Sequence, residues 1–374
     1  MGRSLIEIAQ QLKDSDKKVQ LIYAFNGIGK TRLSLKFIQL IADSNANKEG
    51  GSEPELVREK ILYYNAFTED LFFWDNDLIS HAEPKMIIQP NKFTDWILKN
   101  QGQDRNIIAN FQRYANQKLT PHFSENFTEV TFSLERGNDD HLRNLKISKS
   151  EERTFIWSFF YTLLDQVISI LDVTEPTDRE TDQFDQLKYV FIDDPVSSLD
   201  ENHLIELAVN LGDLIKSKIS DLRFIITTHN PVFYNVLFSE LNNKTGYLLE
   251  RFEDGTFELQ EKGGQSNKSF SYHLHLIQTI DQAVAENQIQ KYHFTLLRNL
   301  YEKTASFLGY RNWQELLPDD KQTYFNRIIQ FTSHSQLSGE IVAALTPQEK
   351  KIIELLLNHL LKNYGFWQQD KQVN

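Results

Sequence analysis

The fold of the N-terminal part of the chain is decided by the stretch Tyr189-Val190-Phe191-Ile192-Asp193-Asp194-Pro195-Val196-Ser197-Ser198-Leu199-Asp200. Its apolar first half predicts a buried strand of a parallel sheet, and ligands collect in the crevice beyond the carboxyl ends of such strands. A carboxylate pair at that point is typical of a nucleotide site, in which Asp193 holds Mg²⁺, directly or through water, and Asp194 orients an attacking water. An acidic turn that only caps a core strand would give the same pattern, so the interpretation depends on partner motifs.

A glycine-containing loop near the N-terminus supplies the first partner motif. The strand-like segment 19–23 leads into it, and a helical pattern from Leu33 to Ile41 follows it. Strand, loop and helix in this order are the context that a phosphate-binding loop requires. Backbone amides of the loop would hold phosphates at the helix N-terminus, aided by the helix dipole. The residues that we expect to bind a nucleotide here are Asn26, Gly27, Gly29, Lys30 and Thr31.

Two side chains of this loop carry its chemistry. Lys30 would reach the β- and γ-phosphates, and the Thr31 hydroxyl would be a ligand of Mg²⁺. Ala24 stands where the motif normally has its first glycine, although alanine is also small. The sequence therefore predicts an ATP or GTP site in which Thr31 and Asp193 hold the metal ion.

Two further side chains are candidates for the same site. The apolar run 222–228 predicts a second buried strand, and it ends at His229, a single crossover helix after the strand of Asp193. A histidine at a strand end is often a capped core residue, but this placement favours a role in nucleotide hydrolysis. Gln89, at the end of a short apolar run, could contact Mg²⁺ or the attacking water, or could be part of a plain polar turn.

The segment Ile147–Glu152 precedes an apolar helical pattern from Phe155 to Leu171. It resembles the signature motif of ABC-type ATPases through Ser148 and Glu151, although both glycines of that motif are replaced. In that family the serine reaches the γ-phosphate of a nucleotide held by the partner subunit. The same two residues form a capping box at a helix N-terminus, and both interpretations can be true together.

The four motifs occur in the order found in ABC-type ATPase heads: Gly27–Thr31, Ser148–Glu151, Asp193–Asp200 and His229. The resemblance implies an α/β head with a mixed, mainly parallel sheet, which forms a homo-oligomer by head dimerisation. It also implies that His229 contacts the γ-phosphate and that Ser198–Asp200 lies at the dimer interface. Asp194 replaces the usual glutamate, so we expect slow hydrolysis. Roughly 115 residues separate the first two motifs, too few for the long coiled coil of SMC-type DNA tethers.

Composition and charge describe an ordinary globular protein. Of the 374 residues 40% are hydrophobic and 25% are charged, and the net charge of −12 argues against a general nucleic-acid binder. The chain has no cysteine, which excludes disulfides and thiolate metal sites. No apolar run approaches the ~20 residues that span a bilayer, and no secretory signal is present. We therefore expect a cytoplasmic protein without a membrane partner.

The pattern changes near residue 265, and we expect two domains, 1–264 and 265–374. The second is almost entirely helical in pattern, which predicts an all-α C-terminal domain. Its expected helices are 274–286, 290–308, 319–331 and 347–364. The last helix has an apolar face that we expect in the core or at a subunit contact, formed by Ile352, Leu355, Leu356, His359 and Leu360.

Three polar side chains form a second chemical centre. Arg298 and Glu302 stand four residues apart on one expected helix and so share a face, and His334 follows where a helix ends. Metal-free RNA cleavage needs a base for the ribose 2′-OH, an acid for the leaving 5′-oxygen and a cation for the phosphorane. A carboxylate, an imidazole and a guanidinium can fill these roles. An ordinary helix-surface ion pair beside an unrelated histidine would contain the same residues.

Over essentially its full length the chain resembles a PrrC-type anticodon nuclease, in which an ABC-like head precedes a helical nuclease domain. Arg298, Glu302 and His334 match that family's Arg/Glu/His triad with separations of 4 and 32 residues. The segment 266–275 resembles the block that joins the two domains. Gln265 stands where an acidic residue that helps to read the wobble base is expected, so substrate preference transfers less securely than reaction type.

The resemblance implies an RNase that cuts a tRNA anticodon loop 5′ to the wobble base, usually in lysine tRNA. The products would be a 2′,3′-cyclic phosphate and a 5′-hydroxyl. It also implies that the protein is a toxin in antiphage defence. A type I restriction–modification complex would keep it silent, phage infection would release it, and the nucleotide state of the head would control its activity. Glu302 is assigned as base and His334 as acid from their chemistry, and the two roles can be exchanged.

Two other functions fit parts of the sequence. The chain could be an ABC-type ATPase subunit whose helical part only regulates a separate effector nuclease. It could also be a DNA-repair ATPase, which would show DNA-stimulated hydrolysis, although the acidic head and the missing coiled coil disfavour this. Replacement of His334 by alanine distinguishes the nuclease from the ATPase subunit.

Overall fold

The structure is a computed structural model, and it describes residues 2–43, 59–65, 71–75, 84–136, 140–142, 144–195, 201–216, 221–242, 245–252, 254–263, 272–332 and 345–364. The chain divides into two compact units, Met1–Ser269 and Phe270–Asn374. The domain junction that we expected, between 264 and 265, lies outside the described ranges.

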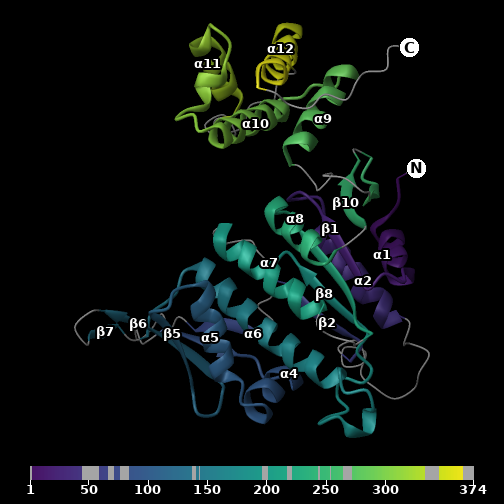
Figure 1. Ribbon diagram of the computed structural model, residues 1–374, viewed down its shortest axis with the longest axis vertical. Coiled ribbons are helices and arrows are strands. Elements are labelled where there is room, and N and C mark those ends of the chain that lie inside the picture. Colours follow the sequence, from purple (N-terminus) through teal and green to yellow (C-terminus); the bar gives the residue numbers. More distant parts are fainter. Residues whose placement is uncertain are drawn as a thin grey trace. The chain divides into compact units, whose positions relative to one another are not determined.

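The first unit is built on a six-stranded sheet with the strand order β11-β10-β1-β9-β8-β2 (Figure 1). Every neighbouring pair is parallel except the hairpin of β10 and β11. The predicted mixed, mainly parallel α/β sheet is therefore confirmed. Its strands are β1 (Val19–Tyr23), β2 (Ile61–Asn65), β8 (Tyr189–Asp193), β9 (Arg223–Thr228), β10 (Thr245–Arg251) and β11 (Phe257–Gly263).

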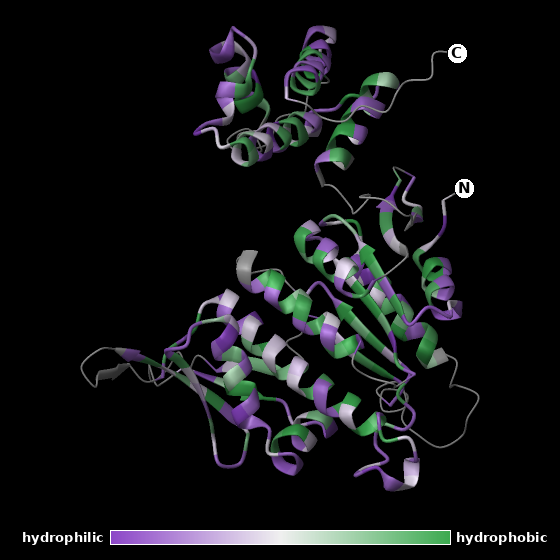
Figure 2. Cartoon of the chain, in the orientation of Figure 1, coloured by the Kyte–Doolittle hydropathy of each residue, from purple (hydrophilic) through white to green (hydrophobic). Residues whose placement is uncertain are grey.

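Helices cover both faces of this sheet, which explains why its central strands are continuous apolar runs. Figure 2 shows these strands as largely hydrophobic. Helices α1 (Leu5–Asp14) and α2 (Lys30–Asp43) lie on one face, and α6 (Lys149–Leu171), α7 (Glu201–Lys216) and α8 (Pro231–Glu240) lie on the other. Two adjacent residues of β2 point to the two faces. The Tyr63 hydroxyl is hydrogen-bonded to the Ser34 hydroxyl of α2, while the ring centre of Tyr64 lies 5.0 Å from that of Trp157 of α6.

A second, smaller sheet packs with α5 and α6 and has the order β3-β4-β6-β5, with β7 paired to β6. The stretch from Phe93 to Leu119 has a largely helical sequence pattern, but in the structure the helix is interrupted. Helix α4 passes into a π-helical turn, the chain continues into α5, and Leu119 opens a strand. These elements are β3 (Phe72–Asp75), β4 (Lys85–Ile88), α4 (Lys92–Asp95), η1 (Trp96–Asn100), α5 (Asp104–Tyr114), β5 (Leu119–Phe123), β6 (Glu129–Arg136) and β7 (Asp140–Leu142).

Helix α6 is the only helix in the described part of the chain that is long and apolar enough to cross a membrane. Most of it is buried inside the first unit, where Phe155 contacts Phe72 and Phe132 and Trp157 contacts Tyr64. Such burial is the behaviour of a core helix.

The second unit consists of helices throughout its described residues. They are α9 (Tyr272–Ala285), α10 (Tyr292–Leu308), the 3₁₀ turn η3 (Trp313–Leu316), α11 (Lys321–Thr332) and α12 (Pro347–Asn363). The positions agree with the expected helices to within a few residues. The expected apolar face of α12 was wrong in part, because Leu355 is 46% exposed while Ile353 and Leu357 are buried. The face that packs is thus rotated from the one that we predicted.

Candidate nucleotide site and candidate RNA-cleavage site

The loop between β1 and α2 has the backbone of a phosphate-binding loop. Gly27 and Gly29 adopt φ angles of +81° and +118°, a region that strongly favours glycine. Ala24 is not among the residues with positive φ. It is fully buried, and its amide donates to the Thr228 carbonyl of β9 at 2.9 Å. The missing first glycine therefore imposes no backbone strain, because this position takes an ordinary conformation.

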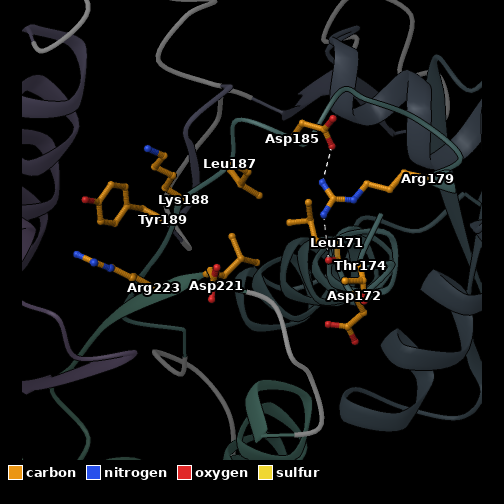
Figure 3. Close-up of a pocket in the computed structure, with 11 residues that line it drawn as sticks. Leu171, Asp172, Thr174, Arg179, Asp185, Leu187, Lys188, Tyr189, Asp221 and Arg223 are labelled. Carbon is orange, nitrogen blue, oxygen red and sulfur yellow. Dashed lines mark hydrogen bonds and ion pairs between the residues drawn. The ribbon is translucent and has the colours of Figure 1, made fainter. Parts of the chain in front are cut away.

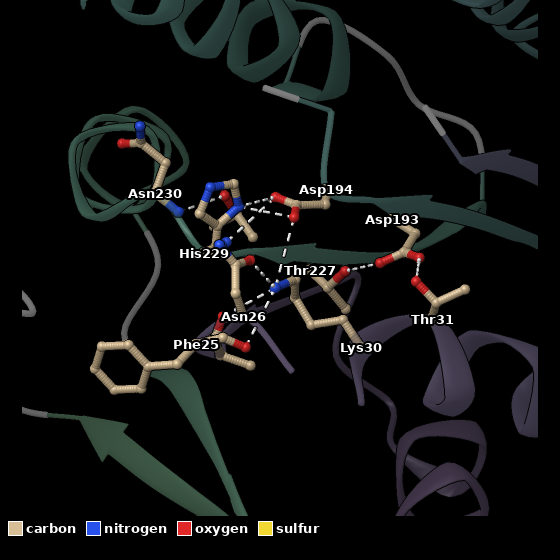
Figure 4. A network of polar contacts seen from close by, with 11 residues as sticks. Phe25, Asn26, Lys30, Thr31, Asp193, Asp194, Thr227, His229 and Asn230 are labelled. Atoms are coloured by element: carbon tan, nitrogen blue, oxygen red, sulfur yellow. Dashed lines mark hydrogen bonds and ion pairs between the residues drawn. The ribbon is translucent and has the colours of Figure 1, made fainter. Parts of the chain in front are cut away.

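The Lys30 ammonium is buried and surrounded by oxygen atoms (Figure 4). It donates to the carbonyls of Ala24 and Phe25 at 3.2 and 3.4 Å and to Asn26 Oδ1 at 3.3 Å. It also lies 3.5 Å from a carboxylate oxygen of Asp194. The lysine expected to reach the phosphates thus points into the loop and toward the end of β8.

Asp193 and Thr31 lie together, as a magnesium site of this class requires. The Thr31 hydroxyl donates to Asp193 Oδ2 at 2.7 Å, and the Thr227 hydroxyl donates to Oδ1 at 2.6 Å. Burial raises the pKa of Asp193 against the opposing effect of these two hydrogen bonds. Hard oxygen ligands suit Mg²⁺, which takes one or two protein ligands besides phosphate and water. Thr31 and Asp193 therefore fit this ion.

Asp194 and His229 form a direct pair at the ends of β8 and β9 (Figure 4). His229 Nδ1 lies 2.8 and 2.7 Å from the two oxygens of Asp194, and the His229 amide donates to Oδ1 at 3.3 Å. Burial alone would raise the pKa of Asp194, but the hydrogen bond from His229 and the charge of Lys30 lower it below its usual value. The sequence predicted that both Asp194 and His229 belong to this site. The structure adds that their side chains are hydrogen-bonded to each other.

The local structure fixes both members of this pair. Asp194 has a φ of +54°, and its amide donates to the Thr227 carbonyl at 3.0 Å. Helix α8 begins directly after His229, where the Asn230 side chain caps it by accepting from two backbone amides and Pro231 is the first helical residue. The histidine is therefore confined between the end of a strand and a capped helix.

The sequence analysis missed a group of polar residues beside Asp193. Asn65 is paired with Asp193 in the register of β2 and β8. The side-chain amide of Asn65 donates to the Tyr63 hydroxyl at 3.0 Å. The same hydroxyl lies 3.0 Å from the Ser34 hydroxyl of α2. An asparagine at the carboxyl end of an apolar strand was the signal that could have indicated this group.

Ser148 and Glu151 form the predicted capping box at the N-terminus of α6. The Ser148 amide donates to the Glu151 carboxylate at 2.7 Å, and the Glu151 amide donates to the Ser148 hydroxyl at 3.3 Å. Ser148 is exposed, so a partner can reach it. Gln89 is also exposed at the end of β4 in the smaller sheet, and its backbone holds it there through bonds with Leu71 and Thr94. A contact of Gln89 with Mg²⁺ remains a prediction, as does Ser198–Asp200 at an interface, whose residues lie outside the described ranges.

A separate cavity of about 620 Å³ lies at the opposite ends of the same strands (Figure 3). It is lined by Tyr189 at the start of β8 and Arg223 at the start of β9, and the ion pair of Arg179 and Asp185 borders it at 2.6 Å. Asp193 and Thr228 end these two strands. Because the strands are parallel, this cavity and the carboxylate site lie at opposite edges of the sheet.

In the second unit, Arg298 and Glu302 form the expected pair on α10. Arg298 Nε donates to Glu302 Oε1 at 2.7 Å, and both side chains are about a third exposed. Phe294, one turn before Arg298, stacks on Phe331 of α11 with ring centres 4.5 Å apart. His334 lies outside the described residues, as does most of the segment 266–275.

The first unit combines a mainly parallel sheet with a glycine loop of the P-loop kind between β1 and α2. No protein-family profile matches the chain. The chain is, however, 65% identical over 394 aligned residues to the curated "Anticodon nuclease" of Escherichia coli, and the match covers 100% of both proteins. The chain belongs to the PrrC-type anticodon nuclease family.

Solved structures similar to the chain are SMC head domains. One from Pyrococcus yayanosii has a TM-score of 0.30 at 10% identity and covers 46% of this chain and 28% of its own. Another, from Pyrococcus furiosus, has a TM-score of 0.30 at 11% identity, with coverages of 69% and 48%. An SmcHead bound to the C-winged helix domain of ScpA has a TM-score of 0.34 at 11% identity, with coverages of 67% and 91%. At these values the likeness adds nothing to the topology described above.

Proposed function

We propose that the protein is a nucleotide-gated endoribonuclease that cleaves tRNA in the anticodon loop. The observation that carries this proposal is the 65% identity to an anticodon nuclease along the whole of both chains. The aligned region includes both the candidate nucleotide site and the candidate cleavage residues. The activity for which that relative is named is therefore the activity that we assign to this chain.

The first unit is the nucleotide sensor in this proposal. ATP or GTP binds with its phosphates on the amides of Gly27–Thr31, and Lys30 exchanges its loop oxygens for phosphate oxygens. Thr31 and Asp193 would hold Mg²⁺, which neutralises phosphate charge when bound. Asp194 stays ionised beside His229 and can orient a water for slow hydrolysis, with His229 turned toward the γ-phosphate.

The second unit is the catalyst. One of Glu302 and His334 removes the proton from the ribose 2′-OH, and the 2′-oxygen then attacks the adjacent phosphorus. Arg298 stabilises the charge of the phosphorane, and the other member of the pair gives a proton to the departing 5′-oxygen. A 2′,3′-cyclic phosphate and a 5′-hydroxyl result. The stacking of Phe331 on Phe294 supports this, because it holds the end of α11, the last described helix before His334 in the sequence, against the turn of α10 that precedes Arg298.

The resemblance supports three finer features of this function. The substrate is lysine tRNA, cut 5′ of the wobble base. The heads dimerise, with Ser148 reaching the nucleotide of the partner subunit. A type I restriction–modification complex keeps the nuclease silent in the cytoplasm until phage infection releases it.

The test is to incubate the purified full-length protein with total tRNA, Mg²⁺ and ATP or GTP, and to map new 5′-hydroxyl ends. We expect one cut in an anticodon loop that disappears in Glu302→Gln and persists in Glu354→Gln, an exposed glutamate of α12. Ends scattered along the tRNA, or no cleavage under any nucleotide condition, would refute the proposal. If tRNA cleavage and toxicity in cells survive in His334→Ala while nucleotide binding is intact, the result would instead favour an ATPase subunit that regulates a separate nuclease.

A further inference from the structure

A cavity of about 490 Å³ lies against the phosphate-binding loop, on the side away from the carboxylates. A Cβ atom placed on Gly29 would lie 3.6 Å from the ring of Phe257 and 3.8 Å from the side chain of Leu5, and both residues line the cavity. Its wall is formed by Ser4, Leu5, Ile6, Arg32, Leu35, Lys36, Gln39, Gly255 and Phe257. Its volume falls within the range of small-molecule sites, roughly 300–1,000 Å³.

The sheet order decides which part of a nucleotide this cavity can receive. Strands β9 and β8 lie on one side of β1. His229 follows the end of β9, and the two aspartates stand at the end of β8. On the other side lie β10 and β11, and Phe257 opens β11. A triphosphate whose γ end points toward Lys30 and Asp194 must extend its nucleoside end in the opposite direction. That direction leads to the cavity.

The wall of the cavity is held in place by regular backbone interactions. Arg3 and Phe257 exchange two backbone hydrogen bonds of 2.8 and 2.7 Å, which tie the N-terminal segment to β11. The capping box of Ser4 and Glu7 then fixes the start of α1. A turn closed by the bond from the Gly255 amide to the Phe252 carbonyl, 3.0 Å, supplies the remaining edge. The site is therefore formed before any ligand arrives.

The side chains of the wall suit a nucleoside that carries phosphate. Leu35 is 55% exposed and Ile6 is 39% exposed, so two aliphatic side chains are available to pack against a base. Among the described residues that line the wall, the charged ones are Arg32 and Lys36, and both are basic. Arg32 follows Thr31 in the first turn of α2. Leu35 lies six residues beyond Gly29, about 9 Å farther along the helix axis.

We propose that this cavity binds the base and ribose of the nucleotide whose phosphates the loop holds. Leu35 and Ile6 pack on the base, and Arg32 contacts the α-phosphate or the ribose. The inference rests on the nucleotide binding proposed above and adds the residues that recognise the nucleoside. It makes the N-terminal segment and the β10–β11 turn part of the nucleotide site.

The test measures affinities of the full-length protein for ATP, GTP and inorganic tripolyphosphate in the presence of Mg²⁺. We expect Leu35→Ser to weaken ATP or GTP binding about tenfold, because an apolar contact with the base is lost, and to leave tripolyphosphate binding unchanged. Ile205→Ser, at a 39% exposed position of α7, is the matched control and should change neither affinity. In a second measurement, 8-azido-ATP or 8-azido-GTP should label peptides that contain Ser4–Ile6, α2 or Phe257.

The outcomes separate this inference from the proposed function. If Leu35→Ser binds ATP and GTP as the wild type does, or weakens tripolyphosphate equally, the cavity is not the nucleoside site. Azido labels found elsewhere on the chain would lead to the same conclusion. If the wild type binds no nucleotide, or Lys30→Met binds it unchanged, nucleotide binding by the loop is itself refuted.

Discussion

Replacement of His229 by alanine tests the pair that closes the nucleotide site. His229 Nδ1 contacts both oxygens of Asp194 at 2.7 and 2.8 Å, and the Asp194 side chain is only 11% exposed. The substitution removes this side-chain hydrogen bond. It leaves the Lys30 ammonium at 3.5 Å and the backbone amide of residue 229 at 3.3 Å from the carboxylate. Of the three partners that Asp194 has among the described residues, the variant keeps two.

The expected loss follows from the strength of a hydrogen bond to a charged group, about 1.5–3 kcal/mol in the free energy of unfolding. We therefore expect His229→Ala to be about 2 kcal/mol less stable at pH 7. The pKa of Asp194 is lowered in the folded state, so its stabilisation is present above the ordinary carboxyl pKa of ~3.9 and is lost as the pH falls through the folded-state value. The difference between wild type and variant should thus shrink below about pH 4.

Urea unfolding at several pH values measures this difference. Tryptophan fluorescence reports mainly the first unit, which contains Trp74, Trp96 and Trp157. His122→Ala is the control, because His122 bonds the neutral Ser133 hydroxyl at 2.7 Å and its loss should cost about 1 kcal/mol or less. Equal stability of wild type and His229→Ala at pH 7, or a difference that persists unchanged at pH 3, would show that this pair does not stabilise the carboxylate.

Three other substitutions have defined expectations. Arg298→Lys keeps the charge but loses the planar group that donates to Glu302, so tRNA cleavage should fall by about 100-fold in an end-mapping assay while nucleotide affinity is unchanged. Tyr64→Phe removes a buried hydroxyl that has no hydrogen-bond partner among the described residues, so unfolding of the first unit should cost about 1 kcal/mol more; a loss of stability would contradict this. Tyr301→Phe removes the 2.9 Å bond to the Leu356 carbonyl and should lower the stability of the second unit by about 1 kcal/mol, and unchanged urea unfolding would contradict the bond.

The sequence predicted the phosphate loop and the strand ends because their signals are local. Gly27 and Gly29 stand at the spacing of the motif, and the run before Asp193 is apolar enough to identify a buried strand. Sequence patterns also located the cap of α6 and the helices of the second unit, where periodicity of apolar residues is clear. In each case a few neighbouring residues determine the backbone conformation.

The contacts between strands could not be predicted in this way. Asp194 meets His229, and Asn65 lies beside Asp193, only because β2, β8 and β9 are neighbours in the sheet. That order depends on packing between distant segments. The interrupted helix after Phe93 was missed for a related reason, since tertiary packing of the smaller sheet overrides a helical pattern that the local residues permit.

In the nucleotide site that we propose, the surroundings of Lys30 determine how a triphosphate would enter. Its ammonium is already coordinated by three neutral oxygens of the loop and faces one carboxylate. Entry is therefore a ligand exchange in which phosphate oxygens take the places of carbonyl and amide oxygens, and the number of bonds to the lysine need not rise. What changes is the charge of the ligands, because neutral carbonyl and amide oxygens give way to anionic phosphate oxygens.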